Sequence, residues 1–185
     1  MEWQSGLRTT LNQINKCEME FIMKHSEDKT NVMRLLEQKK AKYEMHSYAD
    51  TDAISGSDVA KVLGQNPDVV FKTLVTVGKT GSHYVFLVPV EKELDLKKAA
   101  KCVGEKKIDM QKSKDLFDLT GYIHGGCSPI GMKKFFRTII DKSAQAFEHI
   151  VFSGGKIGYQ VEISLDELRK VIKFELEDIT VIHTE

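Results

Sequence analysis

Residues 70–77, Val-Phe-Lys-Thr-Leu-Val-Thr-Val, form the stretch that decides the fold. They are rich in β-branched side chains and are followed by Gly78, which predicts a β-strand. Apolar residues fall on both faces, so we expect a strand that is covered on both sides. Alternation places Lys72 on the same face as Val70 and Leu74. Two interpretations stay open, because a buried ammonium needs acceptors around it: Lys72 either extends to water from the strand end or serves a functional site.

Short strands and short helices are predicted on either side of this strand. The predicted helices are residues 30–40, 57–63, 95–103 and 113–119, a helical turn at 143–147, and a helix that starts at Ser164 with a Ser-x-x-Glu capping box. The predicted strands are residues 43–48, 83–89, 107–110, 135–141, 149–152, 159–163 and 174–182. These elements follow no regular βαβ period. We therefore predict an α+β fold with a mixed, mostly antiparallel sheet or a partly open barrel, surrounded by short helices.

Composition narrows the classes of protein to consider. The 185 residues suit one domain, with 41% hydrophobic and 29% charged residues. We assign that domain to residues 29–185 and describe residues 1–28 as a polar N-terminal extension, helical or disordered. Lys+Arg and Asp+Glu both number 27, so only local basic surfaces could attract nucleic acid. No apolar run is long enough to span a membrane, and no secretion signal is evident.

The cysteines and histidines indicate neither a disulfide framework nor a metal site. Cys17, Cys102 and Cys127 are widely spaced, without a CxxC pair, and the six histidines form no HExxH-like motif. We expect a reducing, cytoplasmic setting, no structural metal and no cofactor.

The predicted helix 95–103 carries a possible phosphate-binding surface. Its predicted buried stripe comprises Leu96, Ala99, Ala100 and Val103. The lysines that lie off this stripe are Lys97, Lys98 and Lys101. Charge alone favours a solvated face, and a patch that contacts phosphates is the sharper alternative.

Residues 121–131, Gly-Tyr-Ile-His-Gly-Gly-Cys-Ser-Pro-Ile-Gly, form the second unusual stretch. Four glycines and one proline predict a rigid loop with exposed backbone amides. Together with the Ser-Gly-Gly at residues 153–155, such amides could stabilise negative charge on an oxygen, and a lysine nearby could polarise a carbonyl. The glycines could equally serve tight turns alone. No Ser-His-Asp or Cys-His arrangement is evident from the spacing.

Several of these motifs, in this order and at these intervals, resemble the YbaK/EbsC family. The motifs are residues 71–74 (Phe-Lys-Thr-Leu), 94–100 (Leu-Asp-Leu-Lys-Lys-Ala-Ala), 120–122 (Thr-Gly-Tyr), 125–131 (Gly-Gly-Cys-Ser-Pro-Ile-Gly) and 153–156 (Ser-Gly-Gly-Lys). That family comprises free-standing aminoacyl-tRNA deacylases similar to the editing domain of bacterial prolyl-tRNA synthetases. The resemblance implies hydrolysis of mischarged tRNA(Pro), chiefly Cys-tRNA(Pro), and prolyl-tRNA synthetase as a possible partner. It also implies that the thiol of the substrate acts as the nucleophile, so that the protein positions the ester and stabilises the oxyanion.

The resemblance also implies the site residues. The family's key lysine corresponds to Lys72, beside Thr73. The loop that faces the aminoacyl carbonyl corresponds to Gly125, Gly126 and Ser128. The remaining substrate-binding positions correspond to Tyr48, Ser153, Gly154, Gly155 and Gln160.

Four positions depart from the family pattern. Cys127 replaces an isoleucine, and His124 stands where an apolar residue is usual. Ile157 and Gln160 replace an arginine and an aspartate. Since that aspartate lies near the family's pocket, Gln160 bears on amino-acid specificity more than on reaction type. The alternatives are a deacylase for Ala-tRNA(Pro) or another aminoacyl-tRNA, and a module with a dead site that binds tRNA or synthetase.

Overall fold

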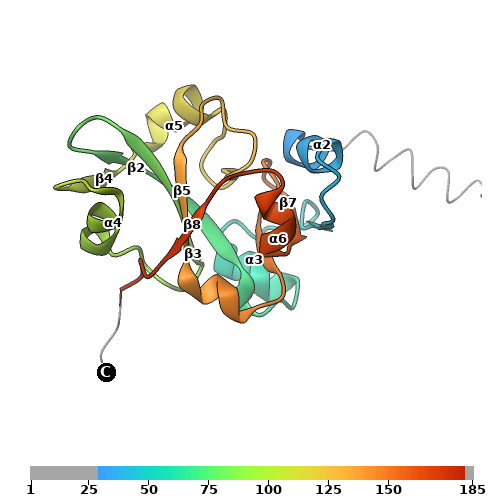
Figure 1. Ribbon diagram of the computed structural model, residues 1–185. Helices are drawn as coiled ribbons and strands as arrows, with labels where there is room; N and C mark the ends of the chain where they lie inside the picture. The colour runs from blue at the N-terminus through green and yellow to red at the C-terminus, as the bar shows by residue number, and fades with distance from the viewer. Residues whose placement is uncertain (1–28, 182–185) are drawn as a thin grey trace, which may run out of the picture.

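The computed structural model describes residues 29–181 and shows two β-sheets flanked by helices (Figure 1). The five-stranded sheet has the order β4-β2-β3-β5-β8, and the three-stranded sheet has the order β1-β7-β6. The strands are β1 (Glu44–Ser47), β2 (Phe71–Gly78), β3 (His83–Pro89), β4 (Ile108–Met110), β5 (Arg137–Asp141), β6 (Ile150–Ser153), β7 (Tyr159–Ile163) and β8 (Glu175–Glu177). The β2–β3, β2–β4, β1–β7 and β6–β7 pairs are antiparallel, whereas β3–β5 and β5–β8 are parallel. The predicted α+β fold is confirmed.

The helices are short and most begin at capping side chains. They are α2 (Asn31–Gln38), α3 (Gly56–Val62), α4 (Leu96–Val103), α5 (Ser113–Thr120) and α6 (Leu165–Arg169), with 3-10 turns η1 (Pro67–Val69) and η2 (Lys142–Ala146). Thr30, Ser55, Asp95 and Ser164 each accept a hydrogen bond from a backbone N–H of the first turn that follows. In residues 29–181, no helix combines the length and apolar character that crossing a lipid bilayer requires.

The central strand β2 is covered on both faces, as its sequence predicts. Phe71 and Val75 belong to the larger core, which also contains side chains of α2 and of the three-stranded sheet. Leu74 packs on the opposite face, against a second core that α4 covers with Ala99 and Val103. Since buried apolar area is the main source of stability, packing between two cores fixes β2 in place. The strand therefore gives its own side chains, including Lys72, a rigid support.

Two local predictions need correction. The predicted buried stripe of α4 includes Leu96, but this residue is 39% exposed at the first position of the helix, where fewer neighbours cover it than in the later turns. The capping box at Ser164 is only half formed. The Ser164 hydroxyl accepts from the Glu167 N–H, but the Glu167 carboxylate binds the Lys42 N–H at 2.7 Å and the Lys170 ammonium at 2.6 Å. Glu167 thus ties α6 to the segment before β1.

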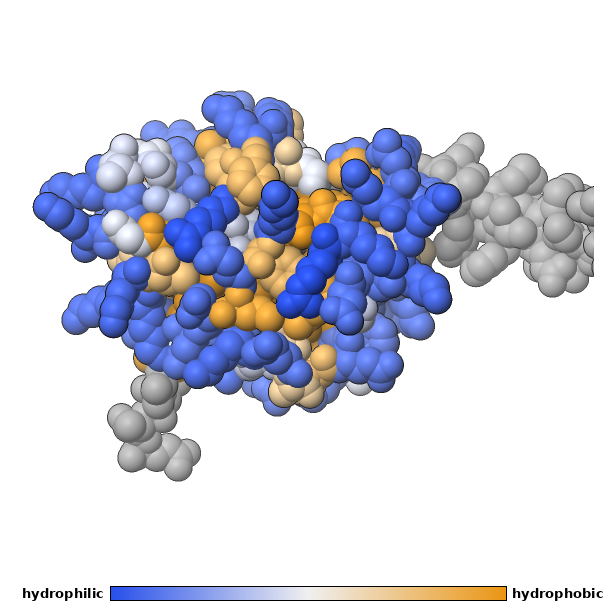
Figure 2. Space-filling view, viewed as in Figure 1, coloured by the Kyte–Doolittle hydropathy of each residue, from blue (hydrophilic) through white to orange (hydrophobic). Residues whose placement is uncertain are grey.

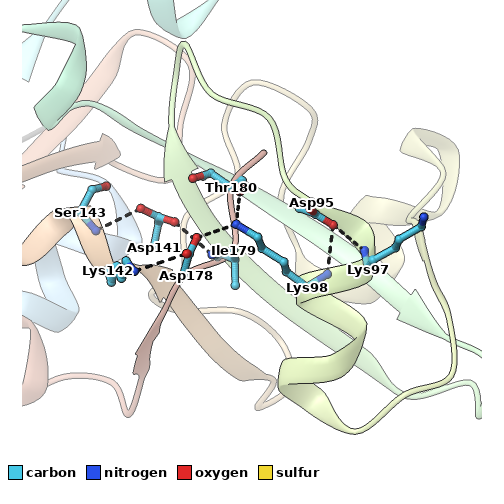
Figure 3. Close-up of polar contacts among 9 residues, drawn as sticks. All are labelled: Asp95, Lys97, Lys98, Asp141, Lys142, Ser143, Asp178, Ile179 and Thr180. Atoms are coloured by element: carbon cyan, nitrogen blue, oxygen red, sulfur yellow. Dashed lines mark hydrogen bonds and ion pairs between the residues drawn. The ribbon is translucent and has the colours of Figure 1, made fainter. Parts of the chain in front are cut away.

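A polar cluster fastens the segment that follows β8 to the rest of the sheet (Figure 3). The Lys98 ammonium donates to an Asp178 carboxylate oxygen and to the Thr180 carbonyl, both at 2.9 Å. The buried Asp141 carboxylate accepts from the Ile179 N–H at 3.2 Å. The cluster lies next to the parallel pairing of β8 with β5 and stabilises it. The Lys98 ammonium is occupied by its contacts with Asp178 and Thr180.

Candidate functional site

A cavity of about 520 Å³ lies beside the first half of β2. β4 pairs with residues 76–78 of β2, and the Gln111 N–H donates to the Val75 carbonyl at 2.9 Å. Within residues 29–181, no named strand pairs with residues 71–74 on that side. The walls come from β2, from the start of α3, from the β4–α5 connection, from the loop at residues 124–127 and from β6 and β7. Of the predicted site residues, the cavity brings together Tyr48, Lys72, Thr73, Gly125, Ser153 and Gln160.

Lys72 lies in the cavity wall, half-buried rather than extended into water. Its ammonium donates to the Val90 carbonyl at 3.2 Å. Burial lowers the pKa of Lys72 from 10.5, and the negative charge of Glu93 partly opposes this effect. Because an ammonium has three N–H donors, two more are available for a ligand oxygen. Lys72 therefore offers a positive charge with reduced hydration, which interacts strongly with an anion or a polarised carbonyl.

Two residues that line the same cavity each have a buried side-chain oxygen without a hydrogen-bond partner among the described residues. These oxygens are Thr73 Oγ1 and Gln160 Oε1. Gln160 is 5% exposed and lies on β7 opposite His46 of β1 and Ser153 of β6. An unpaired buried acceptor costs about 1–3 kcal/mol, so such atoms are normally satisfied by water or by a ligand. Thr73 and Gln160 are thus the lining residues whose buried oxygens would gain most from a ligand with N–H, O–H or S–H groups.

One predicted residue of the glycine-rich loop lines the cavity, and the other two make hydrogen bonds within the loop. Gly125 lines the cavity with φ +85°, a conformation that favours glycine. The Gly126 N–H donates to the Ile123 carbonyl at 3.0 Å, so this amide is not available to a substrate oxygen. Ser128 is fully buried outside the cavity lining, and its hydroxyl accepts from the Ile130 N–H at 3.4 Å. Of the three loop residues predicted for the site, only Gly125 reaches the cavity surface.

The Ser-Gly-Gly turn supports the opposite wall. Ser153 lines the cavity and its hydroxyl accepts from the Gly155 N–H at 3.3 Å. The Gly154 N–H donates to the Tyr159 carbonyl at 2.9 Å, which closes the turn onto β7. Gly155 has φ +87°, and a Cβ atom there would lie 2.7 Å from Val32 Cγ2. Gly154 and Gly155 are thus required for the close approach of this turn to α2 and β7, behind the cavity surface.

Cys127 and His124 also line the cavity, but their environments differ. Cys127 is 7% exposed, and burial raises the pKa of its thiol to about 12. His124 is exposed. A cysteine nucleophile needs a thiolate stabilised by a cation or a helix N-terminus. Burial among apolar side chains has the opposite effect, so Cys127 is a protonated packing residue.

The sequence did not indicate two of the cavity walls. One consists of residues 54–57 and Val59, at the start of α3, and the other of Met110, Gln111, Ser113 and Leu116. None of these residues belongs to a glycine-rich or charged motif, so no sequence signal marked them. Only the folded structure brings them next to β2. The lysines proposed as a phosphate patch on α4, Lys97, Lys98 and Lys101, lie outside the cavity lining.

One group of side chains has the composition of a metal site. Ligand atoms of Glu44, His46 and Glu162 lie within 4.8 Å of one another on β1 and β7. His46 Nε2 is 2.7 Å from Glu162 Oε2, so an ion pair or hydrogen bond accounts for their approach. The three residues lie outside the lining of the cavity.

Comparisons with known proteins show the family and the fold of this chain. Residues 50–171 match the family model of the aminoacyl-tRNA editing domain. EbsC of Enterococcus faecalis, named as a Cys-tRNA(Pro)/Cys-tRNA(Cys) deacylase, is 44% identical over 158 residues, which are 85% of this chain and 96% of EbsC. A proline–tRNA ligase of Pelobacter propionicus is 27% identical over 61% of this chain and 20% of its own length. A crystal structure described as a trans-editing enzyme for prolyl tRNA synthetase has a TM-score of 0.70 at 24% identity, covers 83% of this chain and 99% of its own, and shows the same fold.

Proposed function

We propose a function from one premise: the chain belongs to the aminoacyl-tRNA editing domain family. The protein is a deacylase that hydrolyses the ester of a mischarged aminoacyl-tRNA, and its substrate is Cys-tRNA(Pro). It acts in trans and in the cytoplasm, on tRNA that prolyl-tRNA synthetase has charged wrongly. The relative EbsC, whose name gives this activity, supports the choice of substrate because the alignment covers nearly all of it.

The observation that carries the proposal is the combination of one cation and two unpaired buried oxygens on residues that line one cavity. Lys72 supplies the cation, and Thr73 and Gln160 supply the oxygens. A small aminoacyl group fits this set: its ammonium or thiol donates to the oxygens, and its ester carbonyl or the adjacent ribose and phosphate oxygens accept from Lys72. Tyr48, Gly125 and Ser153 complete the contact surface. Gly126, Ser128, Gly154 and Gly155 hold the two loops in place.

The nucleophile comes from the substrate. The cysteinyl sulfur attacks its own carbonyl carbon, forming a carbon–sulfur bond while the bond from that carbon to the ribose oxygen breaks. The ribose oxygen takes up a proton, and a four-membered cyclic thioester leaves for hydrolysis by water. The protein contributes orientation of the aminoacyl group and stabilisation of the negative charge on the carbonyl oxygen. This division of labour agrees with the raised pKa of Cys127, which leaves the protein without an activated thiol at this site.

A deacylation panel tests the proposal. We expect fast release of cysteine from Cys-tRNA(Pro) and much slower release of serine, which has the same shape but a poorer nucleophile, from Ser-tRNA(Pro). Preference for Ala-tRNA(Pro) would replace the substrate-thiol mechanism with attack by water. No turnover with any aminoacyl-tRNA, together with intact tRNA binding, would instead indicate a binding module.

A further inference from the structure

A second cavity, also of about 520 Å³, lies on the other side of the glycine-rich loop. We refer to it as the Phe135 groove. It is lined by Pro129, Gly131, Met132, Lys133, Lys134, Phe135, Phe136, Thr138, Val171, Ile172 and Lys173. It is thus formed by the end of the loop, the start of β5 and the connection from α6 to β8. In Figure 2, which shows the face that carries β5, α6 and β8, apolar surface lies beside hydrophilic side chains in this region.

The charge of the groove has one sign. Its lining includes three lysines and no acidic residue. Lys133 is held over the Phe117 ring, 4.6 Å from the centroid, and donates to the Phe117 carbonyl at 3.1 Å. Lys134 and Lys173 are exposed, and within residues 29–181 neither forms an ion pair. In a protein with zero net charge, two free ammonium groups beside a groove are a local attraction for a polyanion.

Carboxylates near the groove do not cancel this charge. Glu175 is the nearest in sequence to Lys173, but it forms two hydrogen bonds of 2.7 Å with Arg137. Glu167, on α6, is occupied by Lys170 and by the Lys42 N–H. The free lysines therefore remain available to an outside partner.

Phe135 distinguishes nucleic acid from other polyanions. Its side chain is 78% exposed between Lys134 and the buried Phe136. A bare aromatic ring flanked by cations is the arrangement on which unpaired bases stack while the lysines contact the neighbouring phosphates. A purely acidic protein surface would gain nothing from an exposed phenyl ring, so we take single-stranded RNA as the occupant.

The groove is also close to the deacylation site. Cys127 lines the first cavity and Pro129 lines the groove, and two residues of chain span at most about 7 Å. We propose that the Phe135 groove binds unpaired nucleotides of the tRNA substrate through base stacking on Phe135 and phosphate contacts with Lys134 and Lys173. This inference rests on the proposed function for the identity of the RNA, but its test is separate from catalysis.

The test measures binding of uncharged tRNA by fluorescence anisotropy at several salt concentrations. The double variant Lys134→Gln/Lys173→Gln is compared with Lys79→Gln/Lys106→Gln, which removes two lysines that are also exposed but lie in neither cavity lining. We expect the groove variant to reduce the slope of log affinity against log salt by about 1.4 to 1.8, and the control variant to leave it unchanged. Equal slopes for wild type, groove variant and control overturn the proposal.

Phe135→Leu separates stacking from apolar contact. We expect leucine, which keeps the apolar surface but removes the ring, to weaken binding of tRNA about tenfold. The same variant should not affect a tRNA that lacks its unpaired 3′ nucleotides. If Phe135→Leu and the lysine variant leave RNA binding unchanged and instead impair association with the synthetase, the groove is a protein-binding surface and the proposal fails.

Catalysis on a short substrate distinguishes failure of this inference from failure of the proposed function. The cysteinyl ester of adenosine carries the aminoacyl group but lacks the phosphates and the neighbouring unpaired nucleotides that the groove is proposed to bind. We expect the groove variants to hydrolyse it with unchanged kcat/KM, while their kcat/KM for Cys-tRNA(Pro) falls about tenfold. If the wild type hydrolyses neither substrate, the proposed deacylase function fails, and the salt slopes still decide whether RNA binds the groove.

Discussion

Cys127→Ala tests the assignment of the nucleophile most directly. Burial raises the pKa of Cys127 from 9.0 to about 12. This lowers its thiolate fraction near neutral pH about 1,000-fold, equivalent to about 4 kcal/mol. An enzyme that used this thiol would have to recover that free energy from its contacts with the substrate. We therefore expect Cys127→Ala to retain deacylation of Cys-tRNA(Pro) within about threefold of wild type. Loss of one buried sulfur should cost about 1 kcal/mol of unfolding free energy.

Single-turnover hydrolysis with excess enzyme, measured from pH 6 to 10, is the appropriate assay for Cys127→Ala. If the substrate thiol is the nucleophile, the rate should rise with pH and level off near the ordinary thiol pKa of about 8.5, identically in both proteins. Ser128→Ala, at a buried position beside Cys127, should have a similarly small effect. A loss of more than 100-fold in Cys127→Ala, or an acyl group trapped on Cys127 and detected by mass spectrometry, would refute the reasoning.

Three further changes probe the site and its support. Lys72→Ala should abolish most deacylation, and an unchanged kcat/KM would contradict this. The variant should not reduce the free energy of unfolding near neutral pH, because burial lowers the pKa of Lys72 and the folded protein binds that proton less tightly than the unfolded chain. Lys72 thus contributes stability that is full above pH 10.5 and is lost as the pH falls through its lowered pKa, which pH-dependent urea unfolding measures. Gln160→Leu should reduce kcat/KM about tenfold and keep the affinity for uncharged tRNA; an unchanged kcat/KM would show that Oε1 does not contact the aminoacyl group. Gly155→Ala should lower the urea midpoint more than Gly81→Ala, since both glycines have φ +87° but only at Gly155 would the new methyl group lie within 3 Å of a neighbour, Val32; equal midpoints would argue against the close packing of this turn.

Much of the fold follows from local sequence signals. The predicted strands 70–77 and 83–89 correspond to β2 and β3, and the predicted helices 30–40 and 95–103 correspond to α2 and α4. These signals are local because hydrogen bonds and side-chain alternation act over a few residues. The direction of β5 is not local. A parallel partner for β3 requires the long crossover through α4, β4 and α5, and nothing within residues 135–141 specifies which way the strand runs.

The candidate site was predictable where a charged or glycine-rich motif marks it. Lys72, Gly125 and Ser153 belong to such motifs and line the cavity. The role of Ser128 was not predictable, because a serine in a loop is equally compatible with a surface or a buried position, and only packing places it beneath the loop. The predicted extension at residues 1–28 lies outside the described residues, and its assignment stays a prediction.

The place of β8 in the chain order has a consequence for how the protein matures during synthesis. β5 has Ile139 and Ile140 fully buried and pairs on one side with β3 and on the other with β8. Among the strands of residues 29–181, the ribosome makes β8 last, so in a nascent chain β5 is an unpaired edge until β8 emerges. Such an edge can pair with another chain. The hydrogen bonds of Lys98 and Asp141 with residues 178–180 then favour pairing of β5 with β8 of the same chain over pairing with a strand of another chain.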